Sequence, residues 1–519
     1  MSVASRSIEA PDLGPLIRRG LSWSAMGSIV LRCGQLAVSV VVARLVAPEQ
    51  FGIYAAALVV YAIVTNISDL GLTSALIVEP ARTKELAPTV MTSVLISSTG
   101  MSLLLAGLAG PLAALLGAPA ARPVIQVMAA SIVVGAVGAV PGAVLVRDFR
   151  QRAKFVVDSS SFVFGALVLI VLAASGAGAM ALAWSRVATQ AASLISLLAL
   201  ARERYWPGFS RAAYGHVLRI GLPVAGSSLV GFAVGNVDNF AVARTRGAHE
   251  LGLYSQAYNI SGWPVAVFTA MVDSISVPAL SRVRDNSELF LRHLRAAVSL
   301  LGFVGCLASA LISALAGPLV SVLFGAKWAG AADALQLLAW FGGIRVLIAL
   351  CSDALVALKR TRWLLWLNCL WVTILIPAMM LASQAYGMRG AALMHTVVAA
   401  FVMFPLFVLL VGRAASIGFV WVLGCLGFPA LGAVLAYFAA VSVSTLPAPA
   451  WLRLLAGAAA GTVVYLAVVA FWANRVLLPE LRELYAHGKT PVEIRSAVSE
   501  DLSVPTPIQE TADEARKRQ

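Results

Sequence analysis

The sequence predicts an all-α polytopic membrane protein built from two similar halves, and three observations lead to this fold class. Of the 519 residues, 60% are hydrophobic and only 12% are charged, whereas a soluble domain carries about a quarter charged residues. The apolar residues form repeated runs of about 20 or more, long enough to cross roughly 30 Å of hydrocarbon as a helix. A motif that begins at residue 43 recurs at residue 243, which indicates an internal duplication.

Helices are the expected spanning elements, because backbone groups find no hydrogen-bonding partner in lipid and the alternation of barrel strands is absent. We expect about fourteen spans: 22–43, 52–78, 88–116, 123–145, 155–175, 177–200, 217–242, 252–279, 293–324, 331–357, 363–384, 389–411, 417–443 and 451–472. The third and ninth spans are long enough to tilt or to include interfacial turns.

The polar segments between these spans set the expected domain boundaries. We expect a cytoplasmic N-terminal segment 1–20, a first lobe 21–203, a cytoplasmic inter-lobe loop 204–216, a second lobe 217–412, two extra helices within 413–474 and a polar cytoplasmic tail 475–519. No cleavable signal peptide is expected, since the first apolar run is too long for an h-region. The last twenty residues of the tail, which ends in EARKRQ, are expected to be disordered.

The distribution of positive charge predicts which side of the membrane each loop faces. The formal net charge is +14, and most of the 38 Lys and Arg residues fall on the side of the N-terminus. The opposite loops hold seven: Arg44, Arg122, Arg244, Arg246, Lys327, Arg389 and Arg453. Basic loops stay in the cytoplasm, so we expect both termini there. The excess of basic residues therefore indicates the topology and contact with anionic membrane lipids. No nucleic acid is expected as a partner.

The motif ARLVAPEQFGIY at 43–54 is repeated as ARTRGAHELGLY at 243–254. Both copies fall in an outside loop between an odd-numbered span and the next. Six spans separate the copies, and an even number brings the second half into the membrane in the same orientation. We therefore expect two parallel six-helix lobes related by an axis along the membrane normal, as in transporters whose lobes rock around a central site.

The first copy and its continuation, ARLVAPEQFGIYAAALVVYAIVTNISDLGLTSALI, resemble the first hairpin of the polysaccharide transporter family, which includes the O-antigen and exopolysaccharide flippases. Members typically show A-R-x-L-G-P-x-x-[FY]-G-x-Y followed by D-L-G-L, and Ala47 stands here where glycine is usual. VPALSRVRD and LFGAKWAGAADALQLLAWFGGIRVL in the second half also resemble this family. The resemblance covers most of residues 15–415.

The resemblance implies a fold of the multidrug/oligosaccharidyl-lipid/polysaccharide (MOP) flippase superfamily. It also implies that the protein moves a polyprenyl-pyrophosphate-linked oligosaccharide, a repeat unit of a polysaccharide, lipopolysaccharide or exopolysaccharide, to the outer leaflet of the bacterial inner membrane. Alternating access, coupling to H⁺ or Na⁺, and a polysaccharide polymerase or export complex as a partner are parts of the same expectation. An anionic pyrophosphate needs cations at membrane depth, because a buried anion without partners is too costly.

Three arginines lie near the bilayer middle of their expected spans: Arg32, Arg186 and Arg345. An arginine there costs several kcal/mol unless it faces protein or water, so each should point into the bundle and each is a candidate pyrophosphate ligand. The alternative for Arg32 is a structural ion pair with Asp69, which lies at the same depth in the adjoining span. Asp353 lies two turns from Arg345 on the same helix, too far for a direct bond.

The acidic residues are candidates for ion coupling or structural pairing. Asp238 lies in the outer third of the seventh span with Asn236 and Asn239 nearby, and Asp273 lies in the inner third of the eighth. Hard cations prefer oxygen ligands, so the Asp238 group is a candidate Na⁺ or H⁺ site. The alternative is a cluster whose hydrogen bonds across helices set their packing.

Several other classes of function are not expected. No Walker motif, H-E-x-x-H motif or paired glycosidase carboxylates appear, which argues against an ATP-driven pump and against an enzyme, and no cofactor is expected. The five cysteines have no metal-ligand spacing, and no metal site is predicted. A multidrug exporter of the same superfamily is the alternative, but a cavity for cationic drugs would favour acids and aromatics. A polymerase or ligase usually carries a large outside loop, which is missing here.

Overall fold

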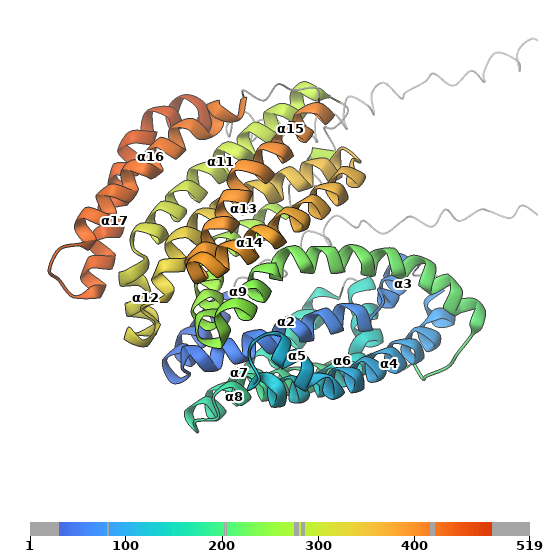
Figure 1. The fold of residues 1–519 in the computed structure, drawn as a ribbon. Coiled ribbons are helices and arrows are strands. Elements are labelled where there is room, and N and C mark those ends of the chain that lie inside the picture. The colour runs from blue at the N-terminus through green and yellow to red at the C-terminus, as the bar shows by residue number, and fades with distance from the viewer. Residues whose placement is uncertain are drawn as a thin grey trace, which may run out of the picture.

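The computed structural model describes residues 31–79, 82–148, 150–201, 203, 205–273, 280–281, 286–415 and 421–479. Regular secondary structure within these ranges is helical, which confirms the predicted all-α fold class. The expected segment 1–20 and most of the expected tail 475–519 lie outside the described residues. Figure 1 shows two groups of helices, one coloured blue to cyan and the other yellow to orange, with the green helix α9 running between them.

The first group contains the helices expected for the first lobe. They are a helix at 31–45, α2 (Pro48–Ser68), α3 (Leu72–Val78), α4 (Thr83–Gly107), α5 (Ala109–Leu115), α6 (Ala121–Arg147), α7 (Gln151–Ala174) and α8 (Ala179–Leu200). The expected span 52–78 is divided into α2 and α3, because Leu70 and Gly71 have φ angles of 48° and 65°, and left-handed residues of this kind end helices. The long third span is likewise divided, into α4 and α5.

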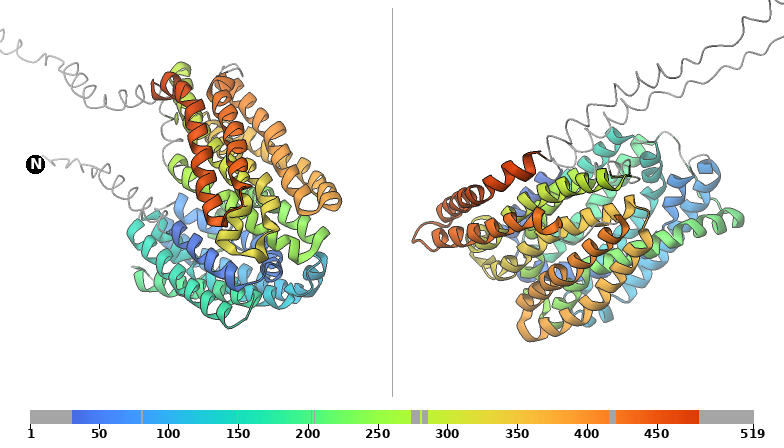
Figure 2. Two further views of the ribbon diagram at one scale, coloured as in Figure 1. Left: turned by 90° about the vertical axis from the view of Figure 1, so that its left-hand side faces the viewer. Right: turned by 90° about the horizontal axis from the view of Figure 1, so that it is seen from above.

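The second group contains the helices expected for the second lobe. They are α9 (Arg211–Asp273), α11 (Ser287–Ala314), α12 (Ala316–Phe324), the 3₁₀ turn η2 (Ala326–Trp328), α13 (Ala331–Ala357), α14 (Thr361–Val397), the π-helical η3 (Val398–Met403) and α15 (Phe404–Ala415). Two further helices, α16 (Trp421–Ser444) and α17 (Ala450–Trp472), pack against α11 and α12 on the outer side of this group, as Figure 2 shows, and the π-helical η4 (Ala473–Leu477) follows them.

Helix α9 contains the expected span 217–242 and most of the span 252–279. Helix α14 contains the span 363–384 and the first part of the span 389–411, which continues through η3 and α15. The chain turns sharply within them at Gly247 (φ 77°, ψ −172°) and at Gly387 (φ 63°, ψ −148°). Only glycine adopts such angles without a steric cost, so these residues permit short connections between neighbouring spans. We call residues 211–246 and 248–273 the first and second halves of α9.

Ten helical segments within the described ranges are long and apolar enough to cross a membrane. One of them, Thr361–Ala415, has 55 residues and includes the turn at Gly387, whereas a single crossing needs about 20. The helices therefore make a multi-pass membrane protein. The expected total of about fourteen spans stays a prediction.

The two copies of the repeated motif pack directly on each other where α2 crosses the second half of α9. A Cβ atom placed on Gly52 would collide with the carbonyl group of Ala248, and one placed on Gly252 would collide with that of Pro48. The contacts are reciprocal at an offset of 200 residues, as expected for two repeats related by an approximate twofold axis. Small residues at such a crossing let two backbones approach closely. We call this end of the molecule the repeat end.

A second pair of equivalent residues has the same role in each lobe. The Gln50 side-chain oxygen accepts a hydrogen bond from the Ala179 N–H at 3.0 Å, at the start of α8. The Glu250 carboxylate accepts one from the Met388 N–H, also at 3.0 Å, just after the turn in α14. The first N–H groups of a helix have no partner within it. Residues 50 and 250 therefore cap the last helix of each six-helix unit, which explains part of the repeated sequence.

Side chains also join the two lobes at the repeat end. The Arg44 guanidinium donates from Nε to the Leu323 carbonyl at 3.0 Å and from Nη2 to the Val322 carbonyl at 2.7 Å. These carbonyls belong to the last turn of α12 and have no acceptor role left within the helix. The Trp328 Nε1 donates to the Ala43 carbonyl at 2.7 Å. The lobes are therefore closed together at this end.

Candidate functional site

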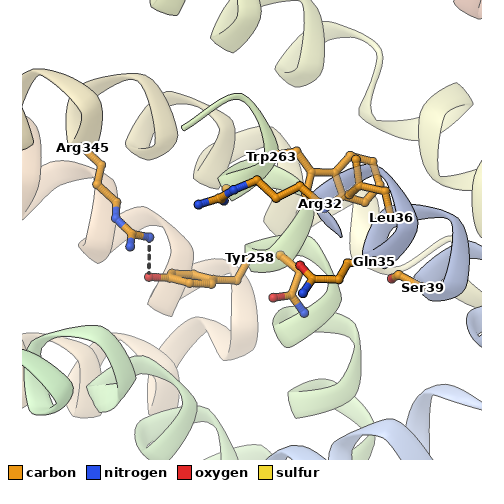
Figure 3. Close-up of a pocket in the computed structure, with 9 residues that line it drawn as sticks. Arg32, Gln35, Leu36, Ser39, Tyr258, Trp263 and Arg345 are labelled. Atoms are coloured by element: carbon orange, nitrogen blue, oxygen red, sulfur yellow. Dashed lines mark hydrogen bonds between the residues drawn. The ribbon is translucent and has the colours of Figure 1, made fainter. Parts of the chain in front are cut away.

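A cavity of about 380 Å³ lies between the two lobes. Its walls come from the helix at 31–45, from the second half of α9 and from α13. Nine residues line it: Arg32, Gln35, Leu36, Ser39, Tyr258, Asn259, Gly262, Trp263 and Arg345. Figure 3 shows two guanidinium groups, two aromatic rings and polar side chains around one space. The lining therefore combines cations, hydrogen-bonding groups and aromatic surface.

Two of the three predicted arginines meet in this cavity from opposite lobes. Arg345 is exposed, and its Nη1 donates a hydrogen bond to the Tyr258 hydroxyl at 3.1 Å. Its guanidinium carbon lies 6.0 Å from the centre of the same ring. Arg32 is half-buried. Within the described ranges no carboxylate forms an ion pair with either guanidinium, so most of their N–H donors are available to an anion.

Arg186 is not part of this cavity. It lies on α8, is exposed, and its guanidinium carbon sits 5.2 Å from the centre of the Tyr61 ring. Tyr61 is buried, and its hydroxyl accepts a hydrogen bond from Ser131 at 3.1 Å. The structure thus gives Arg186 a cation–π contact inside the first lobe and separates it from the other two arginines.

The alternative pairing of Arg32 with Asp69 is not formed. Asp69 follows the end of α2 and accepts a hydrogen bond from the Thr73 hydroxyl at 2.9 Å. It lines a different cavity, of about 310 Å³, between α2, α3 and the first half of α9. Arg32 and Asp69 lie at a similar depth in adjoining spans, but they are on helix faces that point toward different cavities. Their side chains therefore do not meet.

Asp238 lies at the centre of a buried polar cluster in the second lobe. Its side chain is fully buried; Oδ2 accepts a hydrogen bond from the Tyr254 hydroxyl at 2.9 Å, and Oδ1 accepts one from the Asn239 N–H at 2.8 Å. The His395 Nδ1 lies 3.6 Å from Oδ2 and has no hydrogen-bond partner among the described residues. The carboxylate, the phenol and the imidazole therefore share one enclosed site.

The two asparagines near Asp238 turn to other partners. The Asn236 amide donates to the Phe232 carbonyl at 3.0 Å, and the Asn239 side-chain oxygen accepts from Ser255 at 3.0 Å. Their side-chain oxygens do not converge with the carboxylate on one point. No group of three or more His, Cys, Asp or Glu side chains that could hold a metal occurs in the described part of the chain.

The remaining acidic candidates lie elsewhere. Asp273 is the last residue of α9, and its side chain falls outside the described residues. Asp353 is half-buried on α13 and does not line the cavity that contains Arg345.

Sequence reasoning missed several residues of the cavity and of the cluster. Arg32, Gln35 and Ser39 follow each other at intervals of three and four residues, which places them on one helix face. This spacing of polar residues in an apolar span is the signal from which a lined cavity could have been predicted. His395 carries no such pattern, since its partner Asp238 is remote in the sequence.

Comparison with known proteins agrees with this architecture. A family described as "Polysaccharide biosynthesis protein" matches residues 41–333. The chain is 30% identical to the succinoglycan biosynthesis transport protein ExoT of Rhizobium meliloti (strain 1021) over 349 residues, 66% of this chain and 69% of that protein. It is 24% identical to the lipopolysaccharide biosynthesis protein WzxC of Escherichia coli (strain K12) over 380 residues, 72% of this chain and 76% of that protein.

Solved structures are similar in fold at lower identity. The inward closed conformation of the lipid II flippase MurJ matches with a TM-score of 0.74 and 15% identity, over 88% of this chain and 99% of that one. An inward-facing multidrug resistance MATE family transporter of the MOP superfamily matches with a TM-score of 0.61 and 18% identity, over 76% of this chain and 99% of that one. The predicted resemblance is thus confirmed, and the chain belongs to the polysaccharide biosynthesis protein family, with the fold of the MOP superfamily.

Proposed function

We propose that this protein is a flippase for a polyprenyl-pyrophosphate-linked oligosaccharide in the bacterial inner membrane. The observation that carries the proposal is the cavity lined by Arg32 and Arg345 from opposite lobes, neither of which has a carboxylate partner among the residues that the structure describes. Guanidinium groups bind phosphate oxygens through paired, charge-assisted hydrogen bonds. A pyrophosphate between the two side chains would bridge the lobes, so its binding would depend on how far the lobes have rocked.

The rest of the cavity lining suits a sugar next to the pyrophosphate. Gln35, Ser39 and Asn259 provide donors and acceptors for hydroxyl groups, and Trp263 and Tyr258 provide aromatic surface. Ligand sites of this kind combine apolar walls with a few well-placed polar groups. The polyprenyl tail has no place among these polar groups and would stay in the hydrocarbon of the bilayer.

The names of the relatives support transport of a glycan intermediate. ExoT is a succinoglycan biosynthesis transport protein, and MurJ is a lipid II flippase. A multidrug exporter remains the second candidate because a MATE family transporter shares the fold. The two guanidinium groups in the cavity favour an anionic substrate and therefore favour the flippase.

We propose H⁺ rather than Na⁺ as the coupling ion, bound by Asp238 and His395. The Asp238 oxygens already accept two hydrogen bonds, and the carboxylate has no exposed surface, whereas a hard metal ion needs several oxygen ligands. The His395 ring packs 5.9 Å from the Tyr258 ring, centre to centre, and Tyr258 holds Arg345. A proton on this cluster would therefore alter the surroundings of the substrate arginine.

Asp69, Asp273 and Asp353 stay secondary proposals for ion coupling or pairing, and Arg186 stays one for substrate contact. We also retain the predicted orientation, with both termini in the cytoplasm, and an association with a polysaccharide polymerase or export complex. The orientation rests on the distribution of basic residues between loops, and the association rests on the family resemblance alone.

The test of the function is a strain that lacks this gene. Mass spectrometry of its lipids should find an accumulated polyprenyl-pyrophosphate oligosaccharide on the cytoplasmic side, together with loss of surface glycan. The intact gene should reverse both changes. Normal lipid intermediates and a normal surface in the deletion strain, with no second flippase present, would contradict the proposal and favour the exporter.

A further inference from the structure

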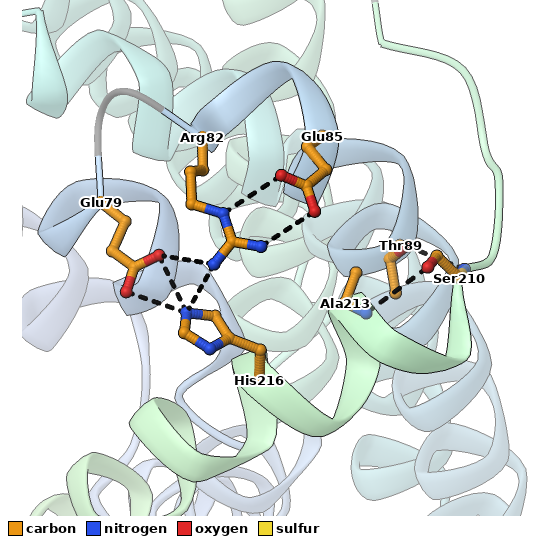
Figure 4. Close-up of polar contacts among 7 residues, drawn as sticks. All are labelled: Glu79, Arg82, Glu85, Thr89, Ser210, Ala213 and His216. Carbon is orange, nitrogen blue, oxygen red and sulfur yellow. Dashed lines mark hydrogen bonds and ion pairs between the residues drawn. The ribbon is translucent and has the colours of Figure 1, made fainter.

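A polar seam joins the start of α9 to the first lobe at the end opposite the repeat end. Figure 4 shows the four charged or titratable side chains involved: Glu79 after α3, Arg82 and Glu85 at the start of α4, and His216 on α9. Since α9 is the first helix of the second repeat, this seam connects the two repeats along one edge of the lobe interface. We call Glu79 and His216 the latch pair.

The latch pair is held by short contacts. The His216 Nε2 lies 2.8 and 2.9 Å from the two carboxylate oxygens of Glu79. A carboxylate can only accept, so Nε2 carries a hydrogen and donates to it. The two side chains are 31% and 29% exposed, and such partial burial reduces screening by water. The contact is thus stronger than an exposed surface pair.

The neighbouring charges leave the latch pair with an excess of negative charge. The Arg82 guanidinium donates two hydrogen bonds to the Glu85 carboxylate, from Nε at 3.1 Å and from Nη2 at 2.9 Å. Its third nitrogen, Nη1, lies 3.5 Å from the Glu79 carboxylate and 3.3 Å from the His216 Nε2. Hydrogen bonding to Glu85 raises the pKa of Arg82, so this guanidinium stays charged. The carboxylates of Glu79 and Glu85 carry two negative charges, and the Arg82 guanidinium carries one positive charge. A second positive charge, on protonated His216, would balance them.

Other charged groups near the seam do not take the place of His216. Lys84 on α4 pairs with Glu203 at 4.0 Å, and both side chains are largely exposed. Arg211 and Arg219 on α9 itself are exposed. Histidine is the side chain whose charge ordinarily changes between about pH 5 and pH 8. Of the four side chains that form the seam, His216 is the histidine.

The seam covers an apolar contact between α9 and the first lobe. Ala213 and Val217 are 2% and 1% exposed and pack with residues of α3 and α4. One turn further along α9, Gly221 lies against the backbone of Leu70 and Gly71. Beyond this contact, Leu222 is 60% exposed and Leu229 is 37% exposed. The start of α9 is thus docked on the first lobe by this apolar contact, by the hydrogen bond from the Ser210 N–H to the Thr89 hydroxyl at 3.1 Å, and by the latch pair.

We propose that the latch pair is a proton-sensitive latch between the repeats. Protonated His216 holds the start of α9 on the first lobe and keeps this edge of the interface closed. Loss of the proton removes the charge attraction to Glu79 and releases the start of α9. The role of this release in a transport cycle rests on the proposed function, but the latch is a property of the protein without substrate.

The test uses thiol labelling of purified protein in which the five native cysteines are replaced. Ala213→Cys reports opening because Ala213 is buried under the seam, and its exposed neighbour Ala212→Cys corrects for the effect of pH on thiol reactivity. The corrected labelling rate should rise several-fold from about pH 5 to pH 8. His216→Gln should label fast at both pH values, and His216→Lys, which keeps the charge, should label slowly at both.

Two further variants provide a control and a second way of breaking the latch pair. Lys84→Gln, which breaks only the exposed pair with Glu203, should behave like the parent protein. Glu79→Gln should label fast at both pH values, which supports the latch even if His216→Gln does not fold. The proposal would be overturned if the corrected labelling rate of the parent protein did not depend on pH. It would also be overturned if the pH dependence persisted in His216→Gln or Glu79→Gln. Neither result bears on lipid accumulation in the deletion strain, so the two proposals fail separately.

Discussion

At the scale of single residues, the chemistry depends on a few polar side chains in an apolar protein. Arg32 and Arg345 line a cavity between the lobes, which is the arrangement that makes an arginine tolerable at membrane depth. The hydroxyl of Tyr258 holds Arg345 in place. On the other side of Tyr258, His395 and Asp238 form the proposed proton site.

Replacing Arg345 should weaken substrate binding more than it weakens folding. A hydrogen bond to a charged group contributes about 1.5–3 kcal/mol, so Arg345→Ala should reduce glycan export roughly ten- to a hundredfold at normal protein levels. Arg345→Lys should restore part of the export, because lysine binds phosphate as a point charge without the fork. Complementation of the deletion strain measures this, with Arg292→Ala, in an exposed pair with Glu288, as the control. Normal export by Arg345→Ala would remove Arg345 from the proposed site.

Neutralising Asp238 should uncouple transport from the proton gradient. In proteoliposomes, an imposed pH gradient should drive uptake of the lipid-linked substrate by the parent protein and not by Asp238→Asn. Asp333→Asn, which breaks an ion pair with Arg389 at 2.7 Å, should stay coupled. Transport driven by a sodium gradient and indifferent to pH would contradict the choice of H⁺.

At the scale of elements, the structure depends on where helices can approach closely. The crossing of α2 and the second half of α9 brings Gly52 and Gly252 against backbone carbonyls of the opposite repeat. The turns at Gly247 and Gly387 divide long helical segments into pairs of spans. Glycine is needed at the crossing for space and at the turns for its φ angle, which are two separate physical reasons.

A methyl group at the crossing should destabilise the protein. Gly252→Ala places a Cβ against the Pro48 carbonyl, and overpacking of this kind costs about 1–3 kcal/mol. Gly100→Ala on α4 is the matched control, because no heavy atom lies within 4 Å of its added Cβ. Thermal unfolding of the detergent-solubilised proteins should show a lower midpoint for Gly252→Ala only. Equal midpoints would show that the crossing of α2 and α9 has room for the added methyl group.

At the scale of the whole molecule, two lobes are joined tightly at the repeat end and enclose a cavity between them. Arg44 reaches the last turn of α12, and Trp328 reaches back to Ala43. The first half of α9 crosses from one lobe to the other and carries the latch pair at its start. A flippase that rocks must break one set of these contacts before the cavity can open on that side.

A cross-link at the repeat end should stop transport without unfolding the protein. Arg44→Cys and Val322→Cys, joined by a bis-maleimide, would hold the first lobe to α12 where the native side chain already reaches the Val322 carbonyl. Export should stop on cross-linking, and the two single-cysteine variants treated with the same reagent should retain it. Full activity of the cross-linked protein would show that the lobes do not part at this end.

The sequence by itself determined the fold class, the duplication and the family, because each depends on local or repeated patterns. Apolar runs of spanning length and an excess of basic residues in alternate loops are readable from composition. The motif at 43–54 and 243–254 is readable from its offset. Arg32 and Arg345 were found because a cation in an apolar span is conspicuous in the sequence.

Only the tertiary structure decided which of these residues meet. It joined Arg32 with Arg345 and left Asp69 and Arg186 apart from them, since depth in the membrane does not specify which helix face points to which cavity. It also joined Asp238 with His395 and Glu79 with His216, pairs separated by more than a hundred residues. Such contacts depend on the packing of whole helices in two lobes, and no local pattern in the sequence encodes that packing.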